Sequence, residues 1–295
     1  MLLDIATYAL IMIDIYAIYK LYIIIKNIYN LKNKLMENKC IIIYDKPERK
    51  YINAILLYIF QFVCDNYVFD INDYKNIIKK LSNCKLNNNC KLNNNCKLNN
   101  NCKLNNNCKL NNNCDINIIY DTNGGNIDSN DILVNYIIES KIKINGYVIE
   151  KSQSAGTILA LLSTNLYMNK EAILSPTDPQ ITIDDESYSI KSIMNLCEKK
   201  DHNYIADKYL LQYYENKKLH YENIDIIKQL IENKVKKNIS NDKKQDLIYK
   251  LTSGDFSHHK PISGLYLNKY ININLDIPNK IKNIYDLFDK VYFYL

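Results

Sequence analysis

Short apolar runs alternate with polar turns and helix-period segments through the first half of this 295-residue chain. Three of these runs are rich in β-branched or aromatic residues and predict buried strands: Cys40–Tyr44, Ile116–Tyr120 and Tyr147–Glu150. Helical spacing of apolar positions predicts an aromatic-rich helix over Lys50–Phe62 and an amphipathic helix over Asp73–Leu81. Strands and helices therefore follow one another closely along this part of the chain.

Residues 116–182 carry the sharpest chemical signal. The turn signal Asn-Gly-Gly-Asn at 123–126 follows a strand, and a helix capped by Asp128 or Ser129 runs from there to about Ser140. Paired glycines let backbone N–H groups face a ligand because no Cβ blocks the approach. The turn is therefore a candidate anion cradle at the end of a strand.

Ser154 lies between a predicted strand and an apolar helix predicted over Ala155–Leu166. Unpaired N–H groups at the start of a helix stabilise an alkoxide or a nearby oxyanion, and the glycine turn supplies further donors. This order resembles a nucleophile elbow without its G-x-S-x-G spelling. A serine before a helix is also a common N-cap, and a glycine pair is commonly only a turn, so both interpretations stand at this point.

Four short motifs resemble, in order, those of the serine dehydrogenase proteinase family, which belongs with signal peptide peptidase A and is related to Clp-type proteases. They match its T-P-G-G, S-A-G-T, G-P-x-D-P-Q and G-x-W-x-H-x-x-P-I patterns at residues 122–125, 154–157, 175–180 and 254–262. Asn123, Ser175 and Phe256 replace the usual proline, glycine and tryptophan. The resemblance implies an α/β fold, a Clp protease/crotonase-like spiral of ββα units with a mostly helical C-terminal part.

By this resemblance Ser154 is the nucleophile, and the backbone N–H of Gly125 forms the oxyanion hole. Gly124 shapes the turn, and Ala155 leaves space for a substrate carbonyl. No histidine follows at 176–180, where Clp-type proteases carry theirs, so a Clp-type triad is not expected.

The general base stays open between a lysine and a histidine. Lys200 and Lys208 are the leading lysines for a Ser–Lys dyad, with Lys191 and Lys199 as further candidates by position. His258 is the alternative, because it matches the family histidine and an imidazole titrates near neutral pH.

Three functions remain open on these residues. The first is a serine peptidase-like hydrolase that cleaves peptides or membrane-protein fragments. The second is a crotonase-type acyl-CoA enzyme, with Asp178 as a candidate acid. The third is a catalytically degenerate, oligomeric scaffold. Family resemblance also leads us to expect a homo-oligomer, and no cofactor or metal.

A perfect hexad repeat, N-C-K-L-N-N, fills residues 83–114 and predicts a low-complexity surface insertion. It holds five of the 38 basic residues and no acidic residue, so the net charge of +6 falls to about +1 without it. A nucleic-acid partner is therefore not expected. The repeat also holds six of the nine cysteines, and the other three lack a framework spacing, which favours reduced thiols in a cytosol-like compartment.

The chain divides into four predicted parts: an N-terminal hydrophobic helix over 1–35, a peptidase domain over 36–275, the repeat inserted at 83–114, and a C-terminal helix over 276–295. The first 25 residues are long enough to span a bilayer, but Asp4, Asp14 and Lys20 interrupt them. Lysines follow this segment, so a spanning helix would leave the catalytic domain in the cytoplasm. The alternative is an amphipathic or buried helix of a cytoplasmic protein, packed on a partner subunit.

Overall fold

The computed structural model describes residues 2–45, 60, 63–64, 67–89 and 115–293. The helix predicted over Lys50–Phe62 lies almost wholly outside these residues, and so does the hexad repeat after its first unit. That first unit continues α3 (Tyr74–Asn89), which begins at the predicted amphipathic segment. The four-part division of the chain stays a prediction.

A mostly parallel sheet forms the centre of the described chain. Its spatial order is β2 (Val68–Asp70), β1 (Cys40–Tyr44), β3 (Asp115–Thr122), β4 (Lys143–Ser152), β6 (Ile173–Leu174) and β9 (Ile262–Ser263), and β5 (Asn165–Met168) also pairs with β4. Among these pairs only β6 and β9 run antiparallel within the part of the chain that is described. The predicted α/β class is confirmed, and all three predicted strands are present, with β4 longer than expected.

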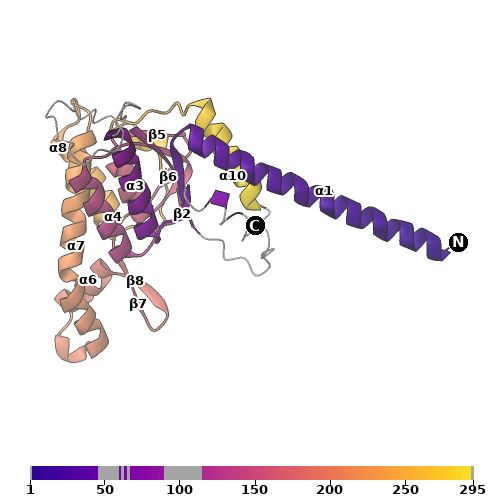
Figure 1. Ribbon diagram of the computed structural model, residues 1–295. Helices are drawn as coiled ribbons and strands as arrows, with labels where there is room; N and C mark the ends of the chain where they lie inside the picture. The colour runs from indigo at the N-terminus through magenta and orange to yellow at the C-terminus, as the bar shows by residue number, and fades with distance from the viewer. Residues whose placement is uncertain (1, 46–59, 61–62, 65–66, 90–114, 294–295) are drawn as a thin grey trace, which may run out of the picture.

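Helices cover both faces of this sheet (Figure 1). One face packs on α3, α4 (Ile127–Ser140), α5 (Ala155–Leu162), α7 (Asp207–Lys234) and α8 (Asn241–Thr252), and the other on α1 (Leu2–Glu37) and α10 (Asn279–Phe293). The strands supply both layers because successive side chains alternate. Ile41 and Ile43 of β1 enter the first core, whereas Cys40 and Ile42 enter the second.

The helix predicted over Ala155–Leu166 is wrong in its second half. Helix α5 ends at Leu162, and the next residue, Ser163, has an extended ψ of 134°. Leu166 and Met168 then alternate with more exposed positions and pair along β4 as strand β5. A short apolar run fits either structure, and pairing with the open edge of β4 decides for the strand.

The chain after residue 180 also differs from the predicted helices. Apolar positions at helical spacing in the sequence predict a helix over Asp185–Cys197, but its start is instead a hairpin of β7 (Gln180–Ile183) and β8 (Glu186–Ser189). Asp184 and Asp185 both have positive φ, the conformation of a two-residue hairpin turn. Helix α6 (Ile190–Lys199) follows, capped by the Ser189 side chain.

Two further helix boundaries correct the sequence predictions. Helical spacing in the sequence also predicts separate helices over Tyr204–Tyr214 and Ile224–Val235. The structure joins most of both in the single helix α7, because no glycine or proline interrupts the segment between them. Helix α4 is capped by Asn126, whose side chain accepts a hydrogen bond from the amide of Ser129, and not by either predicted residue. A 3-10 turn (His202–Tyr204) and the short helix α9 (Gly264–Leu267) complete the described elements.

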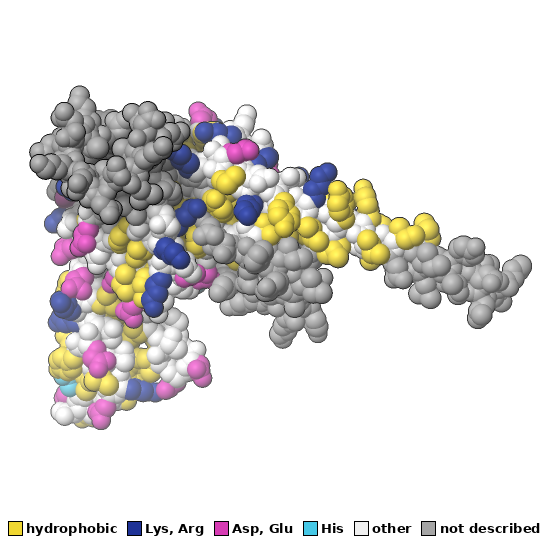
Figure 2. All heavy atoms as spheres, in the orientation of Figure 1, with side chains coloured by type: hydrophobic (Ala, Val, Ile, Leu, Met, Phe, Trp, Pro, Cys, Tyr) yellow, Lys and Arg dark blue, Asp and Glu magenta, His cyan; other side chains and the backbone are white. Residues whose placement is uncertain are grey.

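Helix α1 extends well beyond the body of the molecule, and its C-terminal part lies beside α10 (Figure 1). Ile28, Leu31 and Leu35 are fully buried there. The described side chains from Met12 to Tyr22 are exposed, among them the hydrophobic residues Met12, Ile15, Tyr16, Ile18, Tyr19 and Tyr22. Figure 2 shows hydrophobic side chains along this projecting part. Within the searched part of the chain, no helix combines the length and apolar character needed to cross a bilayer.

Candidate active site

Ser154 occupies a sharp turn between β4 and α5. Its φ of 50° and ψ of −119° are uncommon for a residue with a side chain, and such strained conformations cluster at functional sites. The Ser154 side chain makes no capping hydrogen bond, and within the described residues its hydroxyl has no partner. Ser154 is therefore not an ordinary helix cap, and its Oγ remains available to a ligand.

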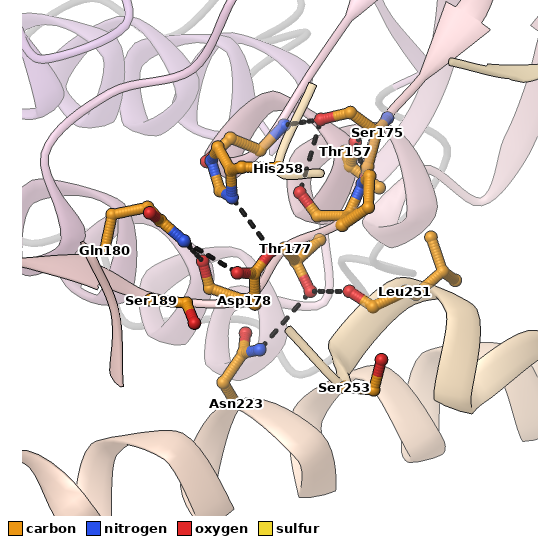
Figure 3. Close-up of polar contacts among 12 residues, drawn as sticks. Thr157, Ser175, Thr177, Asp178, Gln180, Ser189, Asn223, Leu251, Ser253 and His258 are labelled. Atoms are coloured by element: carbon orange, nitrogen blue, oxygen red, sulfur yellow. Dashed lines mark hydrogen bonds and ion pairs between the residues drawn. The ribbon is translucent and has the colours of Figure 1, made fainter. Parts of the chain in front are cut away.

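Ser175 holds this turn from the neighbouring loop. Its Oγ accepts a hydrogen bond from the amide of Ser154 at 2.9 Å. Thr157 fixes Ser175 in turn, because the Thr157 hydroxyl accepts from the Ser175 amide and is 3.0 Å from the Ser175 carbonyl (Figure 3). Both side chains are fully buried. A small polar network thus stabilises the strained backbone of Ser154.

The glycine turn faces Ser154. A Cβ on Gly124 would lie 2.7 Å from the Ser154 Cβ, and the φ of Gly124 is +126°, so both spacing and backbone conformation require glycine. The amide of Gly124 donates to Thr122 Oγ1 at 3.0 Å. Asp45 accepts hydrogen bonds from the Thr122 hydroxyl and the Asn123 amide, which ties the turn to the end of β1.

Asn72 supports the other side of the turn. Its Oδ1 accepts from the Asn126 amide at 2.6 Å, and a Cβ on Gly125 would lie 2.7 Å from the same oxygen. Within the described residues, the amides of Gly125 and Ala155 have no hydrogen-bond partner. Two backbone donors are therefore available beside the Ser154 side chain, the arrangement of an oxyanion hole.

His258 and Asp178 form a pair at the other side of the site. His258 Nδ1 lies 2.8 Å from Asp178 Oδ1, and the Asp178 side chain is only 2% exposed (Figure 3). Gln180 donates to the second carboxylate oxygen of Asp178. Since the carboxylate accepts the Nδ1 proton, Nε2 is the nitrogen of His258 left to receive a proton.

One cavity of about 260 Å³ joins these groups. Ser154, the two glycines, Ala155, Asp178 and His258 all line it. The loop that carries Asp178 is fixed by α7 and α8, because Thr177 bonds to the Leu251 carbonyl and to Asn223 (Figure 3). The geometry therefore collects a hydroxyl, backbone N–H donors and an oriented imidazole around one space.

Burial and neighbouring charges shift the pKa values of two titratable groups near this cavity. Burial, and then the Lys191 charge, lower the pKa of His220, while the Asp178 carboxylate opposes the shift. Burial also raises the pKa of Asp131, and the neighbouring carboxylates of Asp128 and Glu222 raise it further. Within the described chain, no group of three or more His, Cys, Asp or Glu side chains is arranged to hold a metal ion.

A family model described as ClpP-like SDH-type serine proteinase matches residues 107–292. The chain belongs to this family. The family resemblance expected from the four short motifs is confirmed, and with it a ClpP-like fold.

Two uncharacterized proteins of Methanocaldococcus jannaschii are similar to this ClpP-like proteinase family member. MJ1495 is 25% identical over 172 residues, which are 58% of this chain and 56% of the relative. MJ0137 is 25% identical over 138 residues, or 46% of each protein. The chain thus spans about half the length of the curated relatives it matches.

Two solved structures are also similar, both of variants of the 1510-N membrane-bound stomatin-specific protease. The first has a TM-score of 0.37 at 20% identity and covers 58% of this chain and 68% of its own. The second, a complex with a substrate peptide, has a TM-score of 0.36 at 20% identity, with coverage of 57% and 64%.

The predicted site residues form two groups, those that line this cavity and those that do not. Ser154, Gly124, Gly125, Ala155 and His258 line it together. The lysine candidates do not: Lys208 pairs with Asp184 on the exposed hairpin, and Lys200 is an exposed residue at the end of α6. Neither Lys191 nor Lys199 lines the cavity.

Sequence reasoning missed two parts of the site. The sequence indicates Asp178 only as a candidate acid in acyl-CoA chemistry, because its pairing with His258 spans 80 positions of the chain. Ser175 stands in the sequence only as a departure from the family glycine. The one signal for its role is a polar residue at a position where the family motif has glycine.

Proposed function

We propose that this protein is a serine hydrolase that cleaves peptide bonds, with Ser154 as nucleophile and His258 as general base. The observation that carries the proposal is the cavity itself. It brings the unpartnered hydroxyl of a strained strand-to-helix turn together with a histidine oriented by a buried carboxylate. Nucleophile, base and orienting group are the parts that acyl transfer requires.

The proposed reaction begins with attack of Ser154 Oγ on the substrate carbonyl carbon, while the hydroxyl proton passes to His258 Nε2. The oxyanion is held by the amides of Gly125 and Ala155. When the C–N bond breaks, the leaving amine takes the proton from His258, and the acyl group stays on Ser154. Water then attacks the ester with the same histidine as base, which releases the acid and restores the serine.

Asp178 is proposed as the positioning residue of this reaction. Its carboxylate fixes the Nδ1–H tautomer of His258 and stabilises the imidazolium that forms when the proton arrives. The Asp178 carboxylate follows β6 at nearly the place where Clp-type proteases carry a histidine. Here the histidine comes from the loop after α8 instead. Along this chain the proposed carboxylate therefore precedes the proposed base, which is the reverse of the Clp order.

The test is labelling by a fluorophosphonate probe, whose phosphorus is attacked by an activated serine. We expect the wild type to be labelled and Ser154→Ala to lose labelling completely. His258→Ala should be labelled at least about 100-fold more slowly than the wild type. Ser187→Ala and His202→Ala are matched controls, because both residues are exposed and neither lines the cavity. Their labelling should equal that of the wild type.

Lysine variants distinguish this proposal from a Ser–Lys dyad. Lys200→Ala and Lys208→Ala should leave the labelling rate unchanged, because both side chains lie outside the cavity. Absence of labelling in folded wild-type protein, or equal labelling of Ser154→Ala, would overturn the proposed activity. Circular dichroism and a thermal melt of each variant establish that the protein compared is folded.

A further inference from the structure

The cavity beside Ser154 extends between α4 and α7, and this part of it is acidic. Asp131 of α4 and Glu222 of α7 line the cavity. Their carboxylates are close enough for Glu222 to raise the pKa of Asp131. Among the described residues that line the cavity there is no lysine or arginine. Two like charges therefore share one space without a cation from the cavity wall.

The outer environment of these carboxylates does not neutralise them. Lys218 lies 3.2 Å from Glu222, but this pair is on the surface, with side chains 85% and 53% exposed. Such exposed pairs are screened by water and contribute little. Asp128, the other charged group that acts on Asp131, is itself acidic. A cationic group that enters the cavity would be attracted by the carboxylates of Asp131 and Glu222, and no lysine or arginine among the residues that line the cavity would oppose it.

Asn130 supplies an independent sign of an absent ligand. It is only 4% exposed and lines the same cavity, yet its Oδ1 is buried without a hydrogen-bond partner among the described residues. A buried acceptor without a partner is costly, so this oxygen requires a hydrogen-bond donor from a bound molecule or from water. The N–H groups of an ammonium or a guanidinium are such donors.

The remaining wall of this part of the cavity is apolar. It consists of aliphatic side chains from α4, α5 and α7: Ile127, Ile158, Leu219 and Ile226. An aliphatic wall that ends in acceptors and carboxylates is complementary to a long side chain with an alkyl stem and a cationic tip. Lysine and arginine have this form, because their methylene groups pack on apolar surface while the charged end meets polar groups.

We infer that this part of the cavity binds the side chain of a lysine or arginine, the residue whose carbonyl Ser154 attacks. The inference rests on the proposed hydrolase function and gives its substrate class. The aliphatic wall holds the stem, Asn130 Oδ1 accepts one N–H, and Asp131 and Glu222 balance the charge. An acidic side chain at the same position is excluded by repulsion from both carboxylates.

The experiment uses a matched set of peptide diphenyl phosphonates that differ only in the residue next to phosphorus: lysine, norleucine or glutamate. Norleucine keeps the length of the lysine stem and removes the charge. We expect the lysine probe to inactivate the wild type about tenfold faster than norleucine, and the glutamate probe to be slowest. The ratio of the lysine rate to the norleucine rate is the quantity compared between variants.

Asp131→Asn and Glu222→Gln should each lower this ratio severalfold, and the double variant should bring it close to one. Glu139→Gln on α4 and Glu215→Gln on α7 remove exposed charges from the same helices outside the cavity, and should keep the wild-type ratio. These controls distinguish a local contact from a general decrease in negative charge.

A simple fluorophosphonate probe without a side chain distinguishes the proposed hydrolase function from the inference about lysine. If it labels Ser154 while the lysine and norleucine probes react equally, the inference about lysine is overturned and the hydrolase stands. If norleucine reacts faster than lysine, the cavity selects apolar residues and the inference is likewise overturned. If no probe labels folded protein, the proposed hydrolase function fails and the inference fails with it.

Discussion

His258 Nδ1 and Asp178 Oδ1 lie 2.8 Å apart, although 80 positions separate the two residues in the chain. The carboxylate is almost completely buried, whereas the imidazole is 17% exposed and faces the cavity that contains Ser154. One side of the ring is therefore fixed by the protein and the other is available for chemistry. This asymmetry is what a general base requires.

Asp178→Asn tests that relationship. An amide in place of the carboxylate no longer favours the proton on Nδ1 and no longer stabilises the imidazolium, so we expect fluorophosphonate labelling at least about 100-fold slower than wild type. Asp184→Asn is the matched control, because it breaks an exposed ion pair with Lys208 outside the cavity. Unchanged labelling of folded Asp178→Asn would remove Asp178 from the mechanism.

Ser175→Ala tests the support of the Ser154 turn. Loss of the Ser175 hydroxyl leaves the Ser154 amide without its acceptor, which costs about 1–3 kcal/mol of unfolding free energy and slows labelling. Ser189→Ala is a useful comparison, since Ser189 also accepts from a backbone amide but caps α6 outside the cavity. It should lose stability, by about 1 kcal/mol, and keep the wild-type labelling rate. Equal labelling of both variants would contradict the assigned role of Ser175.

Local patterns in the sequence indicate those parts of the candidate site that are continuous in the chain. The glycine turn and Ser154 each follow a strand, and the carboxyl ends of neighbouring parallel strands meet at one edge of a sheet. Thr122 of β3 accordingly pairs with Ser152 of β4, which brings the two turns together. Their proximity follows from strand order and needs no knowledge of the rest of the fold.

The pairing of His258 with Asp178 could not be derived in this way. It depends on α7 and α8 packing against the 176–180 loop, where the Leu251 carbonyl accepts from both the amide and the hydroxyl of Thr177. The order of residues along the chain does not specify such tertiary contacts. The same limit explains the missed hairpin, because the positive φ values of Asp184 and Asp185 are favoured only once β7 and β8 pair.

Gly124→Ala tests the close approach of the glycine turn to the nucleophile. The new Cβ would lie 2.7 Å from Ser154 Cβ at a φ of +126°, so we expect a loss of about 1–3 kcal/mol in unfolding free energy and almost complete loss of labelling. Gly254→Ala introduces a similar backbone penalty, at a φ of +69°, but contacts Lys191 and Ser189 outside the cavity. It should be destabilised and still be labelled. Normal labelling of Gly124→Ala would exclude the proposed geometry of the oxyanion turn.

The buried carboxyl group of Asp121 leads us to expect that the stability of the protein depends on pH, independently of catalysis. It precedes the glycine turn at the end of β3, and its Oδ2 accepts a hydrogen bond from Tyr285 of α10 at 3.0 Å, while Oδ1 is buried without a partner in the described structure. Burial raises the pKa of Asp121 from 3.8 to about 6, against the opposing effects of Tyr285 and Lys151. The ionised carboxylate is thus poorly accommodated in the folded state.

The sign of the effect follows from proton binding. Between pH 3.8 and 6 the folded protein holds the Asp121 proton more tightly than the unfolded chain, so this carboxyl group lowers the unfolding free energy as pH rises through that range. Asp121→Asn, which can still accept from Tyr285, should lack this contribution and be more stable than wild type at pH 7, on the order of 1–3 kcal/mol. Urea unfolding from pH 4 to 7 measures how the unfolding free energy of the wild type and of Asp121→Asn changes with pH. The exposed Asp286→Asn on α10 should follow the wild-type curve, and parallel curves for Asp121→Asn and wild type would show that the carboxylate is not destabilising.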